Sequence, residues 1–394
     1  SFCISLFGRS FRTTGGGMKQ AMAFSGLLHR SFSTSEALKP PHDRFLLYKK
    51  GDIDKMVRSF KKFSDKDWFR AQSSVYDKTV LRLARSRRQP QILEILEHQK
   101  KYDDFTDEKF AARIIKLYGR SNMFKFALKT FDELPERNCP RTVLSLNSLL
   151  ESCVRNKGRG ILKYFRELPP KLSITPNAVS YGLVVKGFCS AGSFDSAIGF
   201  LEEMDKEGVV PDLSTFNFLL SHLRRSTSRI PDMEKVWDRM AAANVTPNAS
   251  SYLSWIIALV SAKRVTEAAS WLEDMERKGM KPTDIIFDVL IKGCCLGGDL
   301  RGAERWYDKT VASRIAPRKE TFWRMIRLAC QEGDFDLVEK LVKRIFAQKC
   351  LVGQATLQMV VDELVQKSRV EAAEKIVRQA KSSAFGYALN MPSK

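Results

Sequence analysis

Clusters of basic residues are the groups in this sequence whose chemistry is easiest to specify. The chain has 66 lysines and arginines against 45 aspartates and glutamates, a net charge of +21, and residues 51–394 keep +15 of it. Closely spaced cations concentrate a polyanion and contact its phosphates, and such binding weakens as salt rises. We predict phosphate contacts at the densest groups, which are Arg85, Arg87 and Arg88, then Arg224, Arg225 and Arg229, then Lys263 and Arg264. Scattered pairs such as Lys49 and Lys50 fit a solvated surface equally well.

The sequence contains no set of residues that could form a catalytic or metal site. Its four histidines are far apart, and its eight cysteines form neither a C-x-x-C pair nor a cluster with histidine. Zinc sites, nucleophilic triads and zinc deaminases need such residues at short, fixed spacing. We therefore expect no enzyme activity, no metal, no cofactor and no small-molecule substrate. Since no apolar run reaches transmembrane length, we also expect no membrane partner.

The elements that position the basic groups repeat along the chain. Prolines recur at spacings of 36, 35, 36, 35 and 35 residues, at Pro140, Pro176, Pro211, Pro247, Pro282 and Pro317. Small or apolar residues recur in the same register at Ala197, Met233, Ala268, Ala303, Val338 and Ala373. An aromatic column follows the same period at Tyr181, Phe216, Tyr252, Phe287 and Phe322, and we expect it to lie between helices. One structural unit of about 35 residues is being stacked.

Each unit has the pattern of two helices. Residues 178–191 and 194–207 are amphipathic with spacings of three and four, and the break at Gly192 separates them. The same break recurs at Gly298 and Gly333 in later units, while Gly208 ends the second helix and Gly279 repeats that closing glycine. No stretch alternates with a period of two for long enough to form a sheet. The pattern predicts an all-α fold, an α-solenoid of about nine helix-turn-helix repeats.

The best-preserved unit resembles a known repeat. Residues 183–212 read LVVKGFCSAGSFDSAIGFLEEMDKEGVVPD, and residues 271–282 read WLEDMERKGMKP. Both resemble the pentatricopeptide repeat, and the resemblance covers roughly residues 50–388. The tetratricopeptide repeat has a period of about 34 and a W-x₂-L-G-x₂-Y signature that this chain lacks. The resemblance implies a right-handed superhelix that binds RNA.

The resemblance also implies which residues read bases. One repeat meets one nucleotide, which is read by the fifth residue of the repeat with the thirty-fifth, while the second residue wedges the base. Only Asn147 with Asn177 and Asn217 with Asn248 match a family pairing well, and both resemble the cytidine-favouring pair. An amide can offer a donor and an acceptor to a pyrimidine. Each asparagine that follows a proline could equally be a helix cap, and the two roles are compatible.

Other repeats match this reading code poorly. Gly182 and Leu253 stand at the fifth position and offer no side-chain hydrogen bond, whereas Trp323 can stack on a base without discriminating. At the wedge position Val179 and Ile285 are suitable, whereas Lys109, Ser214 and Glu320 are poor. Two readable positions in about nine repeats provide little selectivity.

The first 35 residues differ from the rest of the chain. They contain four basic residues and no acidic one, with many serines, threonines and small residues, which is typical of an organellar transit peptide. The stretch around Arg30 resembles the cleavage neighbourhood of plant mitochondrial presequences, so we expect import into the mitochondrial matrix and cleavage near Ser33. The predicted division is a disordered transit peptide over 1–35, a helical half-repeat over 36–72, the repeat array over 73–388 and a tail over 389–394.

Three functions fit these features. The first is a structural RNA-binding component of the small subunit of the mitochondrial ribosome, which binds single-stranded or ribosomal RNA beside mitochondrial ribosomal proteins and so serves translation. The second is a factor that reads one organellar transcript to stabilise it, process it or help translate it. The third is a protein-binding helical scaffold, against which the basic charge argues. Weak reading positions in a basic array favour the first.

Overall fold

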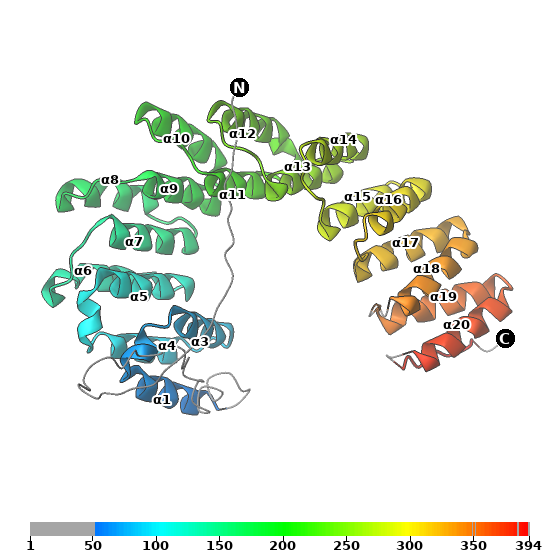
Figure 1. Cartoon of the computed structure of the whole chain (residues 1–394), viewed down its shortest axis with the longest axis horizontal. Helices are drawn as coiled ribbons and strands as arrows, with labels where there is room; N and C mark the ends of the chain where they lie inside the picture. Colours follow the sequence, from blue (N-terminus) through cyan, green and yellow to red (C-terminus); the bar gives the residue numbers. More distant parts are fainter. Residues whose placement is uncertain (1–51, 349, 351, 384–385, 393–394) are drawn as a thin grey trace, which may run out of the picture. The chain divides into compact units, whose positions relative to one another are not determined.

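The computed structural model describes residues 52–348, 350, 352–383 and 386–392 (Figure 1). Within these residues every regular element is a helix. The α-helices are α1 (Ile53–Ser64), α2 (Asp67–Arg70), α3 (Ser73–Arg85), α4 (Gln89–Gln99), α5 (Glu108–Arg120), α6 (Phe124–Asp132), α7 (Val143–Arg155), α8 (Ile161–Leu172), α9 (Ala178–Ala191), α10 (Phe194–Lys206), α11 (Leu213–Leu223), α12 (Ile230–Ala242), α13 (Ala249–Ser261), α14 (Val265–Arg277), α15 (Asp284–Leu296), α16 (Leu300–Ala312), α17 (Lys319–Glu332), α18 (Phe335–Ala347), α19 (Gln354–Gln366) and α20 (Val370–Ser382). Short 3₁₀ turns occupy Asp103–Thr106, Pro135–Arg137 and Thr227–Arg229.

The helices from α3 onward are consecutive pairs. Each first helix from α3 to α17, in steps of two, contacts its own second helix and the first helix of the next pair, and α19 contacts α20. The first helices therefore form a continuous layer, and the second helices pack on it. The predicted all-α solenoid of about nine helical hairpins is confirmed; the handedness of its superhelix stays a prediction. We propose that the array begins at Ser73, where α3 begins.

Turn geometry explains where the helices end. The predicted stops at Gly192, Gly208, Gly279, Gly298 and Gly333 all have positive φ, between 66° and 78°. Glycine adopts this left-handed conformation without the steric cost that a Cβ imposes. Equivalent turns of other pairs hold residues with a Cβ at positive φ, which are Arg87, Asn122, Asn138, Lys157, Ser173, Asn244, Lys263, Arg314 and Ser368. The 35-residue period is therefore a period of backbone conformation as well as of residue type.

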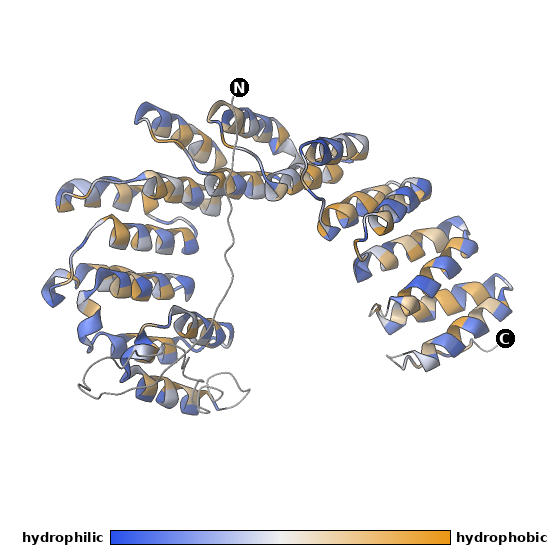
Figure 2. Ribbon diagram, in the orientation of Figure 1, coloured by the Kyte–Doolittle hydropathy of each residue, from blue (hydrophilic) through white to orange (hydrophobic). Residues whose placement is uncertain are grey.

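The two sequence columns form the core between helices. All six residues of the small and apolar column are fully buried, as are Phe216, Tyr252, Phe287 and Phe322 of the aromatic column. Tyr181 is half-buried and packs edge-to-face on Phe165, with ring centroids 4.9 Å apart. Many helices in Figure 2 accordingly carry hydrophobic residues on one side and polar residues on the other. The expectation that the aromatic column is core is confirmed.

Residues near the C-terminus pack on α19. The Tyr387 hydroxyl donates to the Val352 carbonyl oxygen at 2.9 Å, and Gln358 exchanges two hydrogen bonds with the backbone of Asn390, at 2.8 and 2.9 Å. Leu389 is buried. The described part of the predicted tail, residues 389–392, therefore includes backbone held against the last helix pair.

Two expectations concern the membrane and the leader. None of the helices in the described residues is long and apolar enough to cross a membrane. The predicted transit peptide over 1–35, with its cleavage site, lies outside the described residues, as does most of the segment before α1.

Candidate nucleic-acid interface

The first predicted reading pair is held together by direct hydrogen bonds. Asn177 is the N-cap of α9, and its Oδ1 accepts from the backbone N–H of Ser180 at 3.1 Å. Asn147, on α7 of the preceding pair, donates through Nδ2 to Asn177 Oδ1 at 3.2 Å. The Ser180 hydroxyl donates to Asn147 Oδ1 at 2.6 Å. Two residues thirty positions apart therefore meet at one helix entry.

The second predicted pair repeats this geometry. Asn248 caps α13 and accepts from Ser251 N–H at 3.2 Å, and Asn217 on α11 donates to Asn248 Oδ1 at 3.1 Å. The Ser251 hydroxyl donates to Asn217 Oδ1 at 2.6 Å. The cap interpretation of Asn177 and Asn248 is thus confirmed, while reading of bases by all four asparagines stays a prediction. A serine at the third helical position is the third member of each network.

These networks change what the asparagines can offer to RNA. The carbonyl oxygen of every one of the four side chains accepts a hydrogen bond within the protein. Among the described residues no group accepts from the Nδ2 amides of Asn177 and Asn248, and both residues are exposed. The carbonyl oxygens of these two caps each accept at least two hydrogen bonds, so Asn177 and Asn248 present amide donors rather than the donor and acceptor expected from sequence. Donors suit the O2 and N3 acceptors on the pairing edge of cytosine.

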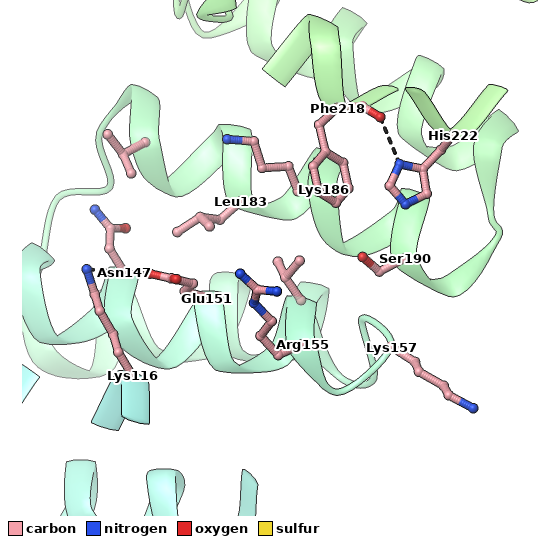
Figure 3. Close-up of a pocket in the computed structure, with 12 residues that line it drawn as sticks. Lys116, Asn147, Glu151, Arg155, Lys157, Leu183, Lys186, Ser190, Phe218 and His222 are labelled. Atoms are coloured by element: carbon pink, nitrogen blue, oxygen red, sulfur yellow. Dashed lines mark hydrogen bonds and ion pairs between the residues drawn. The ribbon is translucent and has the colours of Figure 1, made fainter. Parts of the chain in front are cut away.

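An open groove lies beside the first pair, on α5, α7, α9 and α11 (Figure 3). Its volume is about 710 Å³. Four cationic side chains line it, Lys116, Arg155, Lys157 and Lys186, together with Asn147. The one carboxylate in its lining, Glu151, forms an ion pair with Lys116 at 3.4 Å. Arg155 and Lys157 are exposed and form no ion pair with any described residue, so they are available to phosphates.

One end of the groove carries an aromatic pair. The Phe218 and His222 rings stack with centroids 4.3 Å apart, and His222 Nδ1 lies 2.8 Å from the Phe218 carbonyl oxygen (Figure 3). Burial lowers the pKa of His222; the hydrogen bond with Phe218 opposes that shift, and Arg225 and Arg224 add to it. The imidazole is therefore neutral near pH 7 and adds a flat ring rather than a charge.

The predicted phosphate residues differ in their availability. Five of them are exposed and form no ion pair within the described part of the chain: Arg85, Arg87, Arg88, Arg225 and Lys263. Arg224 is half-buried and its Nε has no partner; burial lowers its pKa. Arg264 pairs with Glu267 at 2.6 Å. The predicted groups therefore contain some cations that are free to contact a phosphate and others that already pair with a carboxylate.

Arg229 is the predicted phosphate residue that the structure supports least. Its guanidinium lies 2.5 Å from Asp195 and 2.9 Å from Asp232, and it sits 5.6 Å from the Phe194 ring centroid. Asp195 belongs to the preceding helix pair, so this arginine joins two repeats. A phosphate would have to displace both carboxylates, and Arg229 is better described as an inter-repeat contact.

Many other cations in or next to the second helices form ion pairs with carboxylates of a neighbouring repeat. They include Arg166 with Glu203, Arg239 with Asp205, Lys309 with Glu276, Lys340 with Glu304 and Arg369 with Asp336. Each partner lies 33 to 37 residues away, which is one repeat. The positive charge left unpaired in the groove therefore belongs to the first helices and the turns that follow them.

Sequence reasoning missed the groove cations, although a periodic signal marks some of them. Arg85, Arg120, Arg155 and Arg225 occupy one position of the repeat, at spacings of 35, 35 and 70 residues. Lys116 and Lys186 are likewise 70 residues apart. Density of charge along the chain does not reveal such sets, because their members meet only when the repeats stack.

Three cations occupy a turn position that glycine fills elsewhere. Arg87, Lys157 and Lys263 follow first helices with φ of 54°, 57° and 62°, whereas Gly192 and other glycines hold this place in other pairs. A left-handed conformation costs a residue with a Cβ about 1 kcal/mol or more. Retained local strain of this kind is common where a side chain has a binding role.

Replacing Lys157 and Lys263 together by glycine should therefore change stability and RNA binding in opposite directions. We expect the free energy of unfolding to rise by about 0.5–1 kcal/mol per site, since glycine relieves the positive φ. RNA affinity should fall, and the salt slope of log K should shrink by about 0.7 per lost phosphate contact. Urea unfolding followed by circular dichroism, and fluorescence anisotropy at several salt concentrations, measure the two effects.

Asn122→Gly is the matched control, because Asn122 occupies the same turn at φ 58° without a charge. It should stabilise the fold and leave RNA affinity unchanged. Unaltered RNA affinity in the double glycine variant would show that these turns do not contact phosphates.

Models of one repeat family match the middle of the chain. A model described as the PPR repeat family matches residues 176–225, the pentatricopeptide repeat domain matches residues 235–297, and the PPR repeat matches residues 113–139 and 285–315.

Curated proteins of Arabidopsis thaliana are also similar. Small ribosomal subunit protein mS79 is 46% identical over 155 residues, which cover 39% of this chain and 39% of that protein. Small ribosomal subunit protein mS78 is 41% identical over 180 residues, or 45% of each. The chain thus matches less than half the length of either. A pentatricopeptide repeat-containing protein described as mitochondrial is 27% identical over 95% of this chain and 87% of its own length.

A solved structure has the same fold. The pentatricopeptide repeat protein PPR10 from maize superimposes with a TM-score of 0.52 at 18% identity, over 84% of this chain and 57% of that one. At that identity the match concerns the fold alone.

Proposed function

This chain is a pentatricopeptide repeat protein, and on that premise we propose that it is a structural RNA-binding component of the small subunit of the mitochondrial ribosome. Its partners would be single-stranded or ribosomal RNA and neighbouring mitochondrial ribosomal proteins. The observation that carries the proposal is the groove of Figure 3, which is lined by four cationic side chains and by Asn147 of the first amide pair.

Phosphate contacts supply most of the affinity in this proposal. The groove cations and the turn cations Arg87, Lys157 and Lys263 are spread over several repeats, and cations at such positions hold an RNA backbone of any sequence. The relatives mS79 and mS78 are named as small ribosomal subunit proteins, which supports the same assignment here. Relatives described as mitochondrial support a mitochondrial location, as does the acid-free leader.

A second function is favoured by one specific feature. Leu144 and Val179 occupy the wedge position of successive repeats and are 36% and 56% exposed, so apolar side chains flank the Asn147–Asn177 pair. The Asn217–Asn248 pair has serines, Ser214 and Ser250, at the same places. One well-built reading site, with a partial second, could align a transcript. Because one base read at about 1–3 kcal/mol cannot select a single site, we rank a transcript-reading factor second.

Catalysis does not enter the proposal. The matched repeats contain no enzyme domain, and we propose that the protein binds RNA without chemical change. A protein-binding scaffold, the third function considered, would have little use for unpaired cations in the first-helix groove.

Sedimentation of the tagged full-length protein from a mitochondrial extract tests these functions. We expect it to migrate with small-subunit ribosomal RNA and to shift to lighter fractions after RNase treatment. Crosslinking should then recover ribosomal RNA fragments.

The other functions give different profiles. Crosslinks at a single short messenger site, lost in Asn147→Ala and Asn217→Ala variants and without ribosome association, would establish the transcript-reading function. Migration in a large complex that RNase leaves intact would favour the protein scaffold.

A further inference from the structure

Trp323 is an unusually exposed aromatic residue on the first-helix layer. It lies on α17 and is 42% exposed, whereas Trp255 on α13 is buried. Large aromatic side chains that are exposed on a protein surface commonly mark a binding site. Trp323 also stands at the position in its repeat that Asn147 and Asn217 hold in theirs, five and three repeats earlier. Its indole therefore lies where the amide pairs lie in other repeats.

Hollows border Trp323 on both sides. One, of about 370 Å³, lies between α15 and α17 and is lined by Lys292, Leu296 and Arg327 as well as Trp323. The other, of about 710 Å³, is lined by Trp323 and Tyr387 among others. Both volumes fall in the range of sites that hold small ligands or parts of larger ones. A flat group can therefore approach the indole.

The charge beside Trp323 is positive and unpaired. Lys292 and Arg327 are exposed, and neither side chain forms an ion pair with another residue that the structure describes. Arg327 lies 5.7 Å from the Trp323 ring centroid, within cation–π range. Arg324 is already neutralised by Asp288 at 2.6 Å. Free cations beside an exposed indole suit an anionic ligand that also has an apolar flat face.

Lys292 and Arg327 occupy the same position of the repeat as two cations of the groove in Figure 3, Lys116 and Lys186. From Lys116 to Arg327 the successive spacings are 70, 106 and 35 residues. A polyanion bound along the first helices by Lys116 and Lys186 would therefore meet cations at the same repeat position near Trp323. Protein ligands show no comparable regular spacing of negative charge, whereas a nucleic acid backbone does.

We propose that Trp323 stacks on one base of single-stranded RNA while Lys292 and Arg327 hold the adjoining phosphates, which makes this repeat a contact without base preference. The proposal rests on the proposed RNA-binding function. Every base has a π face, so stacking holds the strand whatever its sequence. The indole N–H is a single donor, and its orientation is not required for stacking. The repeat that contains Trp323 thereby contributes to RNA affinity although it has no asparagine at the base-reading position.

The test compares RNA affinities of full-length wild-type protein and Trp323→Ala. Fluorescence anisotropy with labelled oligoadenylate, oligouridylate and oligocytidylate should show affinity losses of roughly 5- to 150-fold on all three, the range that stacking of one base supports. Trp323→Phe should retain most of the affinity, because phenylalanine keeps a stacking face. Circular dichroism and thermal unfolding should be unchanged in both variants, since the side chain is exposed.

Trp68→Ala is the matched control. Trp68 is 37% exposed but lies on α2, before the array, so its removal should leave RNA affinity unchanged. If wild-type protein binds none of the three RNAs, the proposed function itself fails. If wild-type protein binds and Trp323→Ala binds equally well, the stacking site is refuted while RNA binding stands. Loss of ribosome association without loss of RNA affinity would likewise refute it and identify a protein contact.

Discussion

Replacing Ala268 by aspartate is expected to destabilise the array by about 3–5 kcal/mol. Ala268 is fully buried on α14 and belongs to the small and apolar column that lets paired helices approach. A carboxylate there would lose its hydration inside the apolar core between the helices. Urea unfolding followed by circular dichroism measures the loss, and the first transition should move to lower urea.

Ser270→Asp is the control for this change. It adds the same charge to the same helix at an exposed position, and it should alter the free energy of unfolding by less than about 0.5 kcal/mol. Equal stability of the two variants would mean that the column does not form the core between helices.

Replacing Arg155, Lys157 and Lys186 together by glutamine is expected to lower RNA affinity about 50-fold near physiological salt. Each phosphate contact with a single strand contributes about 0.7 to the slope of log K against log salt, so three contacts account for a slope of about 2. All three side chains line the groove. Lys186 donates to the Ser214 hydroxyl at 2.7 Å, and no carboxylate of the described residues pairs with any of the three. The loss should be equal for RNAs of different sequence, because phosphates carry no sequence information.

The control removes the same number of charges from the second helices. Lys163, Lys206 and Lys235 are exposed on α8, α10 and α12, and their replacement by glutamine should change RNA affinity much less. Anisotropy titrations at several salt concentrations measure both variants. Equal losses would indicate binding to net charge rather than to the groove.

The asparagine pairs show how far sequence reasoning reached at the candidate site. Their spacing and the family resemblance predicted that Asn147 belongs with Asn177, and a hydrogen bond of 3.2 Å joins them. Sequence reasoning could not predict which hydrogen-bond donors and acceptors of the pair remain free. The Ser180 hydroxyl and the backbone of α9 occupy the carbonyl oxygens, which leaves amide donors facing solvent.

The phosphate candidates stay predictions, and the structure separates them by which cations already have a carboxylate partner. The density of basic residues along the sequence selected Arg229, whose guanidinium is held by Asp195 and Asp232. It did not select Arg155 and Lys186, which line the groove. Local charge density cannot distinguish these residues, because the carboxylate that neutralises a cation lies one repeat away in sequence.

The helices, their pairing and the core of this protein follow from sequence periodicity. Periods of three to four residues and of about 35 residues specify which side of each helix is apolar, and the positive-φ turns recur at the same period. Which polar groups remain available to a ligand follows only from how the repeats stack. Neighbouring repeats stack through contacts 30 to 37 residues apart, and those contacts pair Lys340 with Glu304 while leaving Arg155 and Lys157 exposed in a groove. Whether a cation remains free depends on its distance from carboxylates of neighbouring repeats, and local sequence patterns do not contain those distances.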